Sequence, residues 1–159
     1  MTGPPAEVLV VGVGNVDRGD DGIGPIVARR VAGLRLPGVR VVQRAEPLDL
    51  VDDCATTDVL VVVDAVRSGR PAGALVVQEV DQRPLPAWTG AGGTHAFGLA
   101  AAVELARAMG RMPRRLVLVG VEAESFRTGA ALSAPVRDAI ESAVRAVTSA
   151  ADARLAGDG

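Results

Sequence analysis

The sequence predicts an α/β protein, a three-layer α/β/α sandwich around a mostly parallel sheet of about five strands, one of them antiparallel. Short valine-rich runs alternate along the chain with segments whose apolar residues recur at helical spacing. Most of these runs are apolar without alternation, which is typical of parallel strands buried on both faces. Aromatic residues make up only 2% of the chain, so an aliphatic core is required, as in a valine-rich sheet beneath Ala/Leu helices.

The first half of the chain predicts three strands with a helix after each of the first two. The expected strands are 7–13, 39–42 and 59–63, and the expected helices are 20–32 and 48–54. The third run is entirely apolar, which places it near the centre of the sheet.

The second half predicts two more strands and two more helices. The strand at 74–80 follows a connection too short for a crossover helix, so we expect it to run antiparallel to the third strand, near an edge. The rest of this half predicts a Pro- and Gly-rich mobile loop at 83–94 and a helix at 95–109 that Thr94 can cap. A strand at 116–121 and a last helix from 133 onward, capped by Ser133, follow. We expect one domain over 1–159, with a core of 7–150 and a frayed tail after about residue 155.

Composition excludes several classes of function. The net charge of −2 gives no basic footprint for nucleic acid. No apolar run approaches the roughly 20 residues that cross a bilayer, and the N-terminus lacks the features of a signal peptide. Cys54 is the only cysteine, which excludes a disulfide framework and a thiolate-rich metal site. We therefore expect a cytoplasmic protein without nucleic-acid or membrane partners.

Two adjacent carboxylates follow the first strand and its glycine-rich turn. We assign Asp20 the role of N-cap of the following helix, where a carboxylate accepts backbone N–H groups and suits the helix dipole. A second carboxylate is not needed for capping and adds repulsion unless a cation or proton is near. Asp21 is therefore the better candidate for a ligand.

Two further polar residues stand at ends of expected elements. Asp64 closes the central apolar run and is either a ligand or a turn-forming aspartate that bonds its own backbone. His95, the only histidine, follows a glycine-rich stretch at a helix start, which favours the neutral, metal-binding ring. A lone histidine is otherwise more often a satisfied, partly buried residue. Glu122 and Glu124, just past the fifth strand, are second-sphere groups or solvated loop acids.

If they converge, the carboxyl groups of Asp21 and Asp64 and the imidazole of His95 form a three-ligand site at the carboxyl edge of the sheet. This donor set suits a first-row divalent ion such as nickel, zinc or manganese, and it leaves coordination open for substrate. A dinucleotide site is the weaker reading, because Asp17 stands where the fingerprint needs its third glycine.

Several separate blocks of the chain resemble the hydrogenase maturation endopeptidases, in order and at compatible spacing over roughly residues 7–150. The blocks are Gly12-Val13-Gly14-Asn15, Asp20-Asp21-Gly22-Ile23-Gly24, Val63-Asp64-Ala65, Thr94-His95-Ala96-Phe97-Gly98-Leu99, the stretch 119–126 and Leu132-Ser133-Ala134-Pro135. Many members carry Asp-Gly-Gly just after the second strand, where this chain has Gln43-Arg44-Ala45-Glu46. Asp17 also stands where a hydrophobic residue is common, and both departures bear on partner specificity.

The resemblance implies an α/β/α endopeptidase of aspartic or metal-dependent type that works in the cytoplasm. It would remove a short C-terminal extension from the precursor of a nickel–iron hydrogenase large subunit once nickel is inserted. By motif position, the family's metal-binding residues correspond to Asp21, Asp64 and His95, so catalysis and metal binding fall on the same three side chains. The metal would be the substrate's own nickel, or another divalent transition metal held by the protein itself. We expect a monomer.

The alternative from another class is a non-catalytic relative that binds metal or the precursor without cutting it. Among catalytic mechanisms, Cys54 is a poor nucleophile because it lies in an expected helix with no second histidine to activate it. A serine triad is excluded for the same reason if His95 is a ligand.

Overall fold

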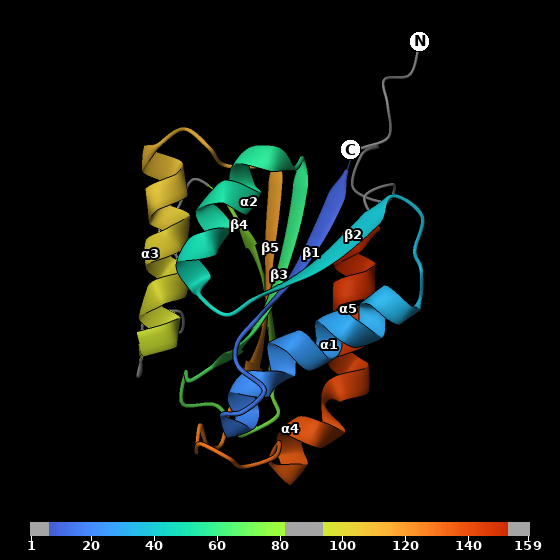
Figure 1. Cartoon of the computed structure of the whole chain (residues 1–159), viewed down its shortest axis with the longest axis vertical. Coiled ribbons are helices and arrows are strands. Elements are labelled where there is room, and N and C mark those ends of the chain that lie inside the picture. The colour runs from blue at the N-terminus through green and yellow to red at the C-terminus, as the bar shows by residue number, and fades with distance from the viewer. Residues whose placement is uncertain (1–6, 82–93, 153–159) are drawn as a thin grey trace.

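The computed structural model describes residues 7–81 and 94–152, with the backbone only for residues 94–97. Its five strands form one sheet in the order β2-β1-β3-β5-β4 (Figure 1). The strands are β1 (Val8–Val13), β2 (Val39–Arg44), β3 (Val59–Val66), β4 (Leu75–Val80) and β5 (Arg115–Glu122). β1, β2, β3 and β5 are parallel to one another, and β4 runs antiparallel to β5. The predicted α/β class is confirmed.

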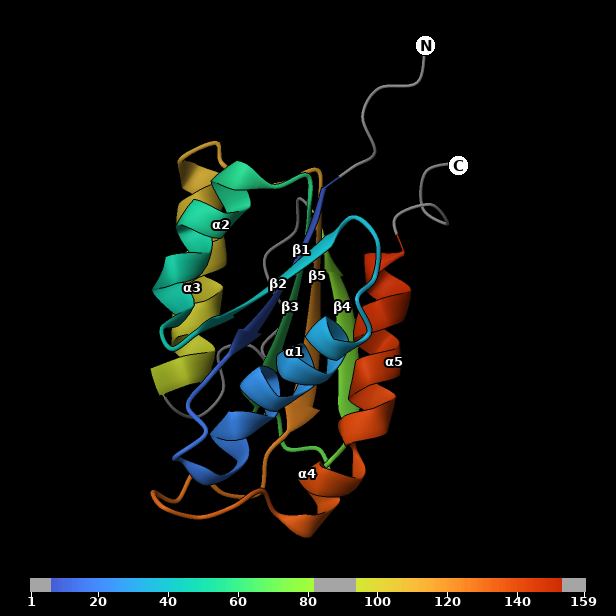
Figure 2. The same ribbon diagram turned by 45° about the vertical axis from the view of Figure 1, so that its right-hand side comes forward.

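Helices cover both faces of the sheet. They are η1 (Gly19–Gly22), α1 (Ile23–Gly33), η2 (Pro47–Asp49), α2 (Leu50–Thr56), α3 (Thr94–Ala108), α4 (Ala134–Asp138) and α5 (Ile140–Ala151). α1 and α5 pack on one face, and α2 and α3 pack on the other, as Figures 1 and 2 show. The core is therefore two aliphatic layers separated by the sheet, which is the predicted three-layer sandwich. Among the described residues, no helix has the length and apolar character needed to cross a membrane.

The position of β4 differs in part from the prediction. It is antiparallel and lies at an edge, as expected, but it pairs with β5, which separates it from β3. The connection after β3 therefore passes the end of β5 instead of closing a hairpin. Backbone hydrogen bonds hold this arrangement: Gly73 N donates to Glu122 O (2.8 Å), and Ala123 N donates to Val66 O (2.9 Å). In its central position β5 buries both faces, and this burial stabilises the sheet more than an edge position of β5 would.

Two other elements differ from the predicted bounds. The last helix is broken at Ala139 into α4 and α5, and Ser133 occupies the N-cap position of α4 but makes no side-chain cap hydrogen bond, because its hydroxyl donates to Asp20. β3 continues through Asp64 to Val66, so Asp64 is a strand residue and does not form a turn at the end of the predicted strand. The predicted loop at 83–94 lies outside the described residues except for Thr94, and the predicted frayed tail lies outside them entirely.

The chain reverses its direction of winding between β1 and β3. From β1 it passes through α1 to β2 on one side, and then returns through α2 to β3 on the other side. In open α/β sheets, the carboxyl ends of two such strands border a crevice in which ligands bind. The loop after β1 and the end of β3 therefore mark the place where this fold builds a site.

Two glycines allow α1 to approach this part of the sheet closely. A Cβ atom on Gly12 would overlap Gly24 O and would lie 2.6 Å from the Cβ of Ala28. A Cβ atom on Gly24 would overlap Val13 O and would lie 2.7 Å from Val63 O. The first turn of α1 thus rests directly on the backbones of β1 and β3, and this contact places the preceding turn, η1, at the ends of both strands.

Candidate active site

Two buried acids occupy the crevice between β1 and β3. Asp21 lies in η1, which follows β1 after the turn at 14–18, and is 0% exposed, while Asp64 lies in β3 and is 1% exposed. Side chains alternate along a strand, so Asp64 shares its face of the sheet with Leu60 and Val62, which belong to the core layer beneath α2 and α3. The predicted convergence of these two carboxyl groups is supported by the electrostatic effect of one on the other.

That effect is seen in the pKa of Asp64, which lies well above its ordinary range. Burial is the largest cause, the negative charge of Asp21 is the second, and a hydrogen bond from the Ala65 amide opposes both. Two buried carboxyl groups this close need a proton or a cation between them, because neither can shed its charge into water. A proton on Asp64 or a bound cation would each relieve the repulsion between the two acids.

The hydrogen bonds of Asp64 leave one of its carboxylate oxygens available for such a ligand. Asn15 N donates to Asp21 Oδ2 (2.9 Å), and Ala65 N donates to Asp64 Oδ1 (2.8 Å). Asp64 Oδ2 is buried and has no hydrogen-bond partner among the described residues. A buried carboxylate oxygen without a partner is costly, and a bound cation would remove that cost.

His95 lies outside the residues whose side chains are described, so the third predicted ligand is placed by its backbone only. It is the second residue of α3, and a Cβ atom on Gly98, one turn further along, would lie 3.2 Å from Pro47 Cγ. Pro47 follows the carboxyl end of β2. The start of α3 therefore lies near the acidic edge of the sheet, on the face that Asp64 shares. Among the side chains that are described, no three His, Cys, Asp or Glu groups form a metal-holding cluster.

Asp20 does not cap its own helix, which corrects the sequence prediction. η1 has no side-chain cap, and its N-cap position is Arg18. The Asp20 carboxylate does accept backbone N–H groups, but they come from Glu124, Ser125 and Ser133, more than 100 residues away. Local sequence could not reveal these partners, because nothing in the Asp-Asp pair indicates which distant loop lies against it.

The other polar candidates are separate from the acid pair. Glu122 is buried, and it accepts hydrogen bonds from Ser68 N, Ser68 Oγ and Gly69 N, so it anchors the turn after β3. Glu124 is exposed, as a solvated loop acid would be. Cys54 is buried in α2, and burial, with a smaller effect from Asp53, raises the pKa of its thiol to about 11. A thiol in this state is a poor nucleophile.

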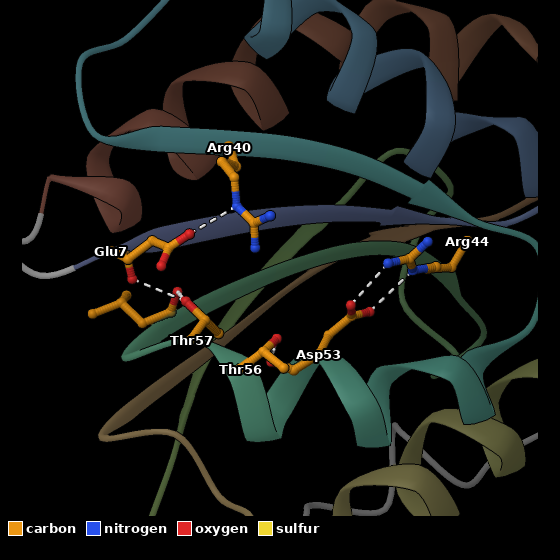
Figure 3. A network of polar contacts seen from close by, with 7 residues as sticks. Glu7, Arg40, Arg44, Asp53, Thr56 and Thr57 are labelled. Carbon is orange, nitrogen blue, oxygen red and sulfur yellow. Dashed lines mark hydrogen bonds and ion pairs between the residues drawn. The ribbon is translucent and has the colours of Figure 1, made fainter.

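The segment that departs from the Asp-Gly-Gly pattern contributes a structural ion pair. Arg44, at the end of β2, donates from Nε and Nη2 to the two carboxylate oxygens of Asp53 in α2, at 3.1 and 2.9 Å (Figure 3). Figure 3 also shows the more exposed ion pair between Arg40, in the same strand as Arg44, and Glu7, just before β1. Because Arg44 O accepts a hydrogen bond from Gly14 N (3.0 Å), the end of β2 is fixed both to α2 and to the turn that leads toward Asp21.

The fold and the acid pair define an α/β sandwich with a carboxylate site at its switch point, and similarity to known proteins specifies the class. The family model for hydrogenase maturation proteases matches residues 41–150. The hydrogenase 2 maturation protease of Escherichia coli (strain K12) is 32% identical over 146 residues, covering 90% of this chain and 89% of that protein. The hydrogenase expression/formation protein HupM of Azotobacter chroococcum is 35% identical over 150 residues, covering 91% and 71%.

Solved structures agree with this assignment. The hydrogenase maturating endopeptidase HybD of E. coli superposes with a TM-score of 0.78 at 28% identity, covering 95% of this chain and 94% of that one. The solution structure of an E. coli endopeptidase gives a TM-score of 0.80 at 30% identity, with the same coverage. The chain belongs to the hydrogenase maturation protease family, and it is a peptidase.

Proposed function

We propose that this peptidase removes the C-terminal extension of a nickel–iron hydrogenase large-subunit precursor after nickel insertion, and that it recognises the substrate through the inserted metal. Membership of the family supports the reaction, and the buried acid pair supports recognition of a metal. The observation that carries the proposal is the buried Oδ2 of Asp64, which has no hydrogen-bond partner among the described residues and lies in the electrostatic field of Asp21. Such an oxygen suits a cation that arrives with its substrate.

In this proposal, Asp21, Asp64 and His95 coordinate the nickel of the precursor. Two carboxylates and one imidazole are suitable ligands for nickel, although the same set also suits zinc or manganese. Coordination would hold the scissile peptide beside the site, so that proximity supplies much of the rate acceleration. One of the carboxyl groups would then serve as the base that activates the attacking water. We place the reaction in the cytoplasm, with the enzyme acting as a monomer.

The test compares two forms of one substrate. The purified protein is incubated with nickel-loaded and with nickel-free hydrogenase precursor, and the products are weighed by intact-mass spectrometry. We expect a C-terminal peptide to be lost only from the loaded form. Binding of the loaded form without any loss of mass would instead identify a non-catalytic module. The enzyme is first treated with a chelator and dialysed, and continued cleavage then shows that it needs no resident ion of its own.

Substitution of the histidine should abolish processing without disturbing the fold. For His95→Ala we expect cleavage of the loaded precursor to fall by at least about 100-fold, as for loss of a metal ligand or its support. Alanine is well tolerated in the first turn of a helix, so the melting temperature should stay near that of the wild type. Glu104→Ala, on the exposed side of the same helix, is the control and should cleave normally. Cleavage that survives His95→Ala would remove the imidazole from the site.

A further inference from the structure

We infer that Asp20 is a positioning residue of this enzyme: its carboxylate ties η1 to the loop at 124–133 and so holds Asp21 in place beside Asp64. The inference rests on the proposed function only for the catalytic role of Asp21. The hydrogen bonds of the Asp20 carboxylate to the 124–133 loop, here called the tether, lie entirely among the described residues. Asp20 is 0% exposed although it carries a carboxyl group, and a buried acid of this kind needs compensating partners.

Its partners all come from one distant loop. Asp20 Oδ2 accepts hydrogen bonds from Glu124 N (2.8 Å), Ser125 N (3.0 Å) and Ser133 Oγ (2.9 Å), and Oδ1 accepts one from Ser133 N (2.7 Å). Four donors converge on two oxygens, and three of them are backbone groups. The side chain therefore closes the two ends of the 124–133 loop onto η1.

Backbone contacts extend the same junction. Asp20 N donates to Ser125 O (2.9 Å), Gly19 N donates to Ala130 O (3.1 Å), and Gly129 N donates to Asp17 O (2.7 Å). A Cβ atom on Gly19 would lie 2.8 Å from Ser125 O. The turn before Asp21 is thus held closely against the loop after β5, and η1 has no side-chain cap of its own to hold it otherwise.

The geometry of a 3₁₀ turn connects this tether to the active site. With three residues per turn, neighbouring side chains point about 120° apart. Asp20 can therefore face the 124–133 loop while Asp21, the next residue, faces β1 and β3. On the inner side, Asp21 Oδ2 accepts a hydrogen bond from Asn15 N (2.9 Å), and this bond reports whether Asp21 is in place.

The chemistry of the tether requires a carboxylate. An ionised carboxyl group offers only acceptors, which matches four converging donors. In Asp20→Asn, the amide NH₂ would face at least one N–H donor, so at least one of the four hydrogen bonds is lost and two donors are brought into conflict. The variant keeps the size of the side chain and changes only its donor and acceptor character.

The experiment follows the Asn15 amide by hydrogen exchange and cleavage by steady-state kinetics. In Asp20→Asn we expect exchange at Asn15 to be faster by roughly tenfold or more, and kcat for the nickel-loaded precursor to fall roughly 10- to 100-fold, as for residues that orient metal ligands. Ser133→Ala removes one donor and should give the same changes in weaker form, while Ser133→Thr keeps the hydroxyl and should restore wild-type values.

A core variant separates positioning from general loss of stability. Val147→Ala removes buried volume in α5, within the other aliphatic layer, and should lower the melting temperature while leaving kcat and Asn15 exchange close to wild type. The inference is overturned if the amides of residues 124, 125 and 133 lose protection in Asp20→Asn while Asn15 exchange and kcat do not change. If the wild-type protein does not cleave the precursor, the proposed function fails, and the Asn15 measurement still decides whether Asp20 positions Asp21.

Discussion

Asp64→Asn is expected to abolish cleavage and, at the same time, to stabilise the metal-free protein at neutral pH. If Asp64 coordinates the substrate's metal as proposed, its loss should remove several kcal/mol of transition-state stabilisation, which is roughly a 1,000-fold or greater fall in rate. Stability should rise because Asp64 is ionised at high pH in a place that disfavours its charge: it is buried and lies in the field of Asp21. The asparagine side chain has no charge to bury, and its Oδ1 can still accept from Ala65 N.

The stability difference between the wild type and Asp64→Asn should depend on pH, and its direction follows from the raised pKa of Asp64. The folded-state pKa of Asp64 is raised above its unfolded value of about 3.9, so the folded protein binds a proton that the unfolded chain releases. The stability of the wild type therefore falls as pH rises from about 4 toward the raised pKa, and it levels off above that value. Asp64→Asn lacks this fall, so its advantage should grow with pH. Urea unfolding in chelator at several pH values measures the difference.

Asp53→Asn is the matched control, because it makes the same chemical change at another buried acid. The Asp53 carboxylate is balanced by two hydrogen bonds from Arg44, so removing its charge should lower stability by about 1 kcal/mol, given that Arg44 is over a third exposed. Cleavage should continue. An Asp64→Asn protein that is less stable than the wild type throughout the pH range would show that Asp64 is not an uncompensated acid.

The acid pair could be predicted because its placement follows from the order of elements. A strand, a glycine-rich turn and a helix bring Asp21 to the carboxyl end of β1, and the buried run of β3 brings Asp64 to the same edge. Parallel strands share that edge, so two acids at their ends must be near each other if the strands are neighbours. Pairing of β1 with β3 meets this condition.

What could not be predicted depends on contacts between distant parts of the chain. The insertion of β5 between β3 and β4 is held by backbone hydrogen bonds at Gly73 and Ala123, and backbone groups have no sequence signature. The partners of Asp20 are likewise mostly amides of the 124–133 loop. The sequence predicts the correct kind of partner for Asp20, backbone N–H groups, but places them in the wrong element, because capping its own helix is the local solution and the actual contacts are long-range.

Gly24→Ala should be the most destabilising single-methyl substitution in the helical layers, and it should also disable the site. The new Cβ would overlap Val13 O and would lie 2.7 Å from Val63 O, and neither backbone oxygen can move without distorting its strand. Helix α1 must therefore shift away from the sheet. We expect a loss of about 3 kcal/mol or more in the free energy of unfolding, as for severe overpacking, and hence a melting temperature lower by about 6–12 °C.

The same shift of α1 should also lower the rate of cleavage, because η1 directly precedes α1 and carries Asp21. Gly33→Ala, in the last residue of the same helix, is the control: a Cβ atom there meets nothing within 4 Å, and alanine should stabilise the helix slightly. The pair compares one methyl group at the sheet contact with one in open space. If both variants melt and cleave like the wild type, the close approach of α1 to β1 and β3 does not hold the acidic turn in place, and the position of Asp21 must depend on its other contacts, such as the Asp20 hydrogen bonds and the bond from Asn15 N.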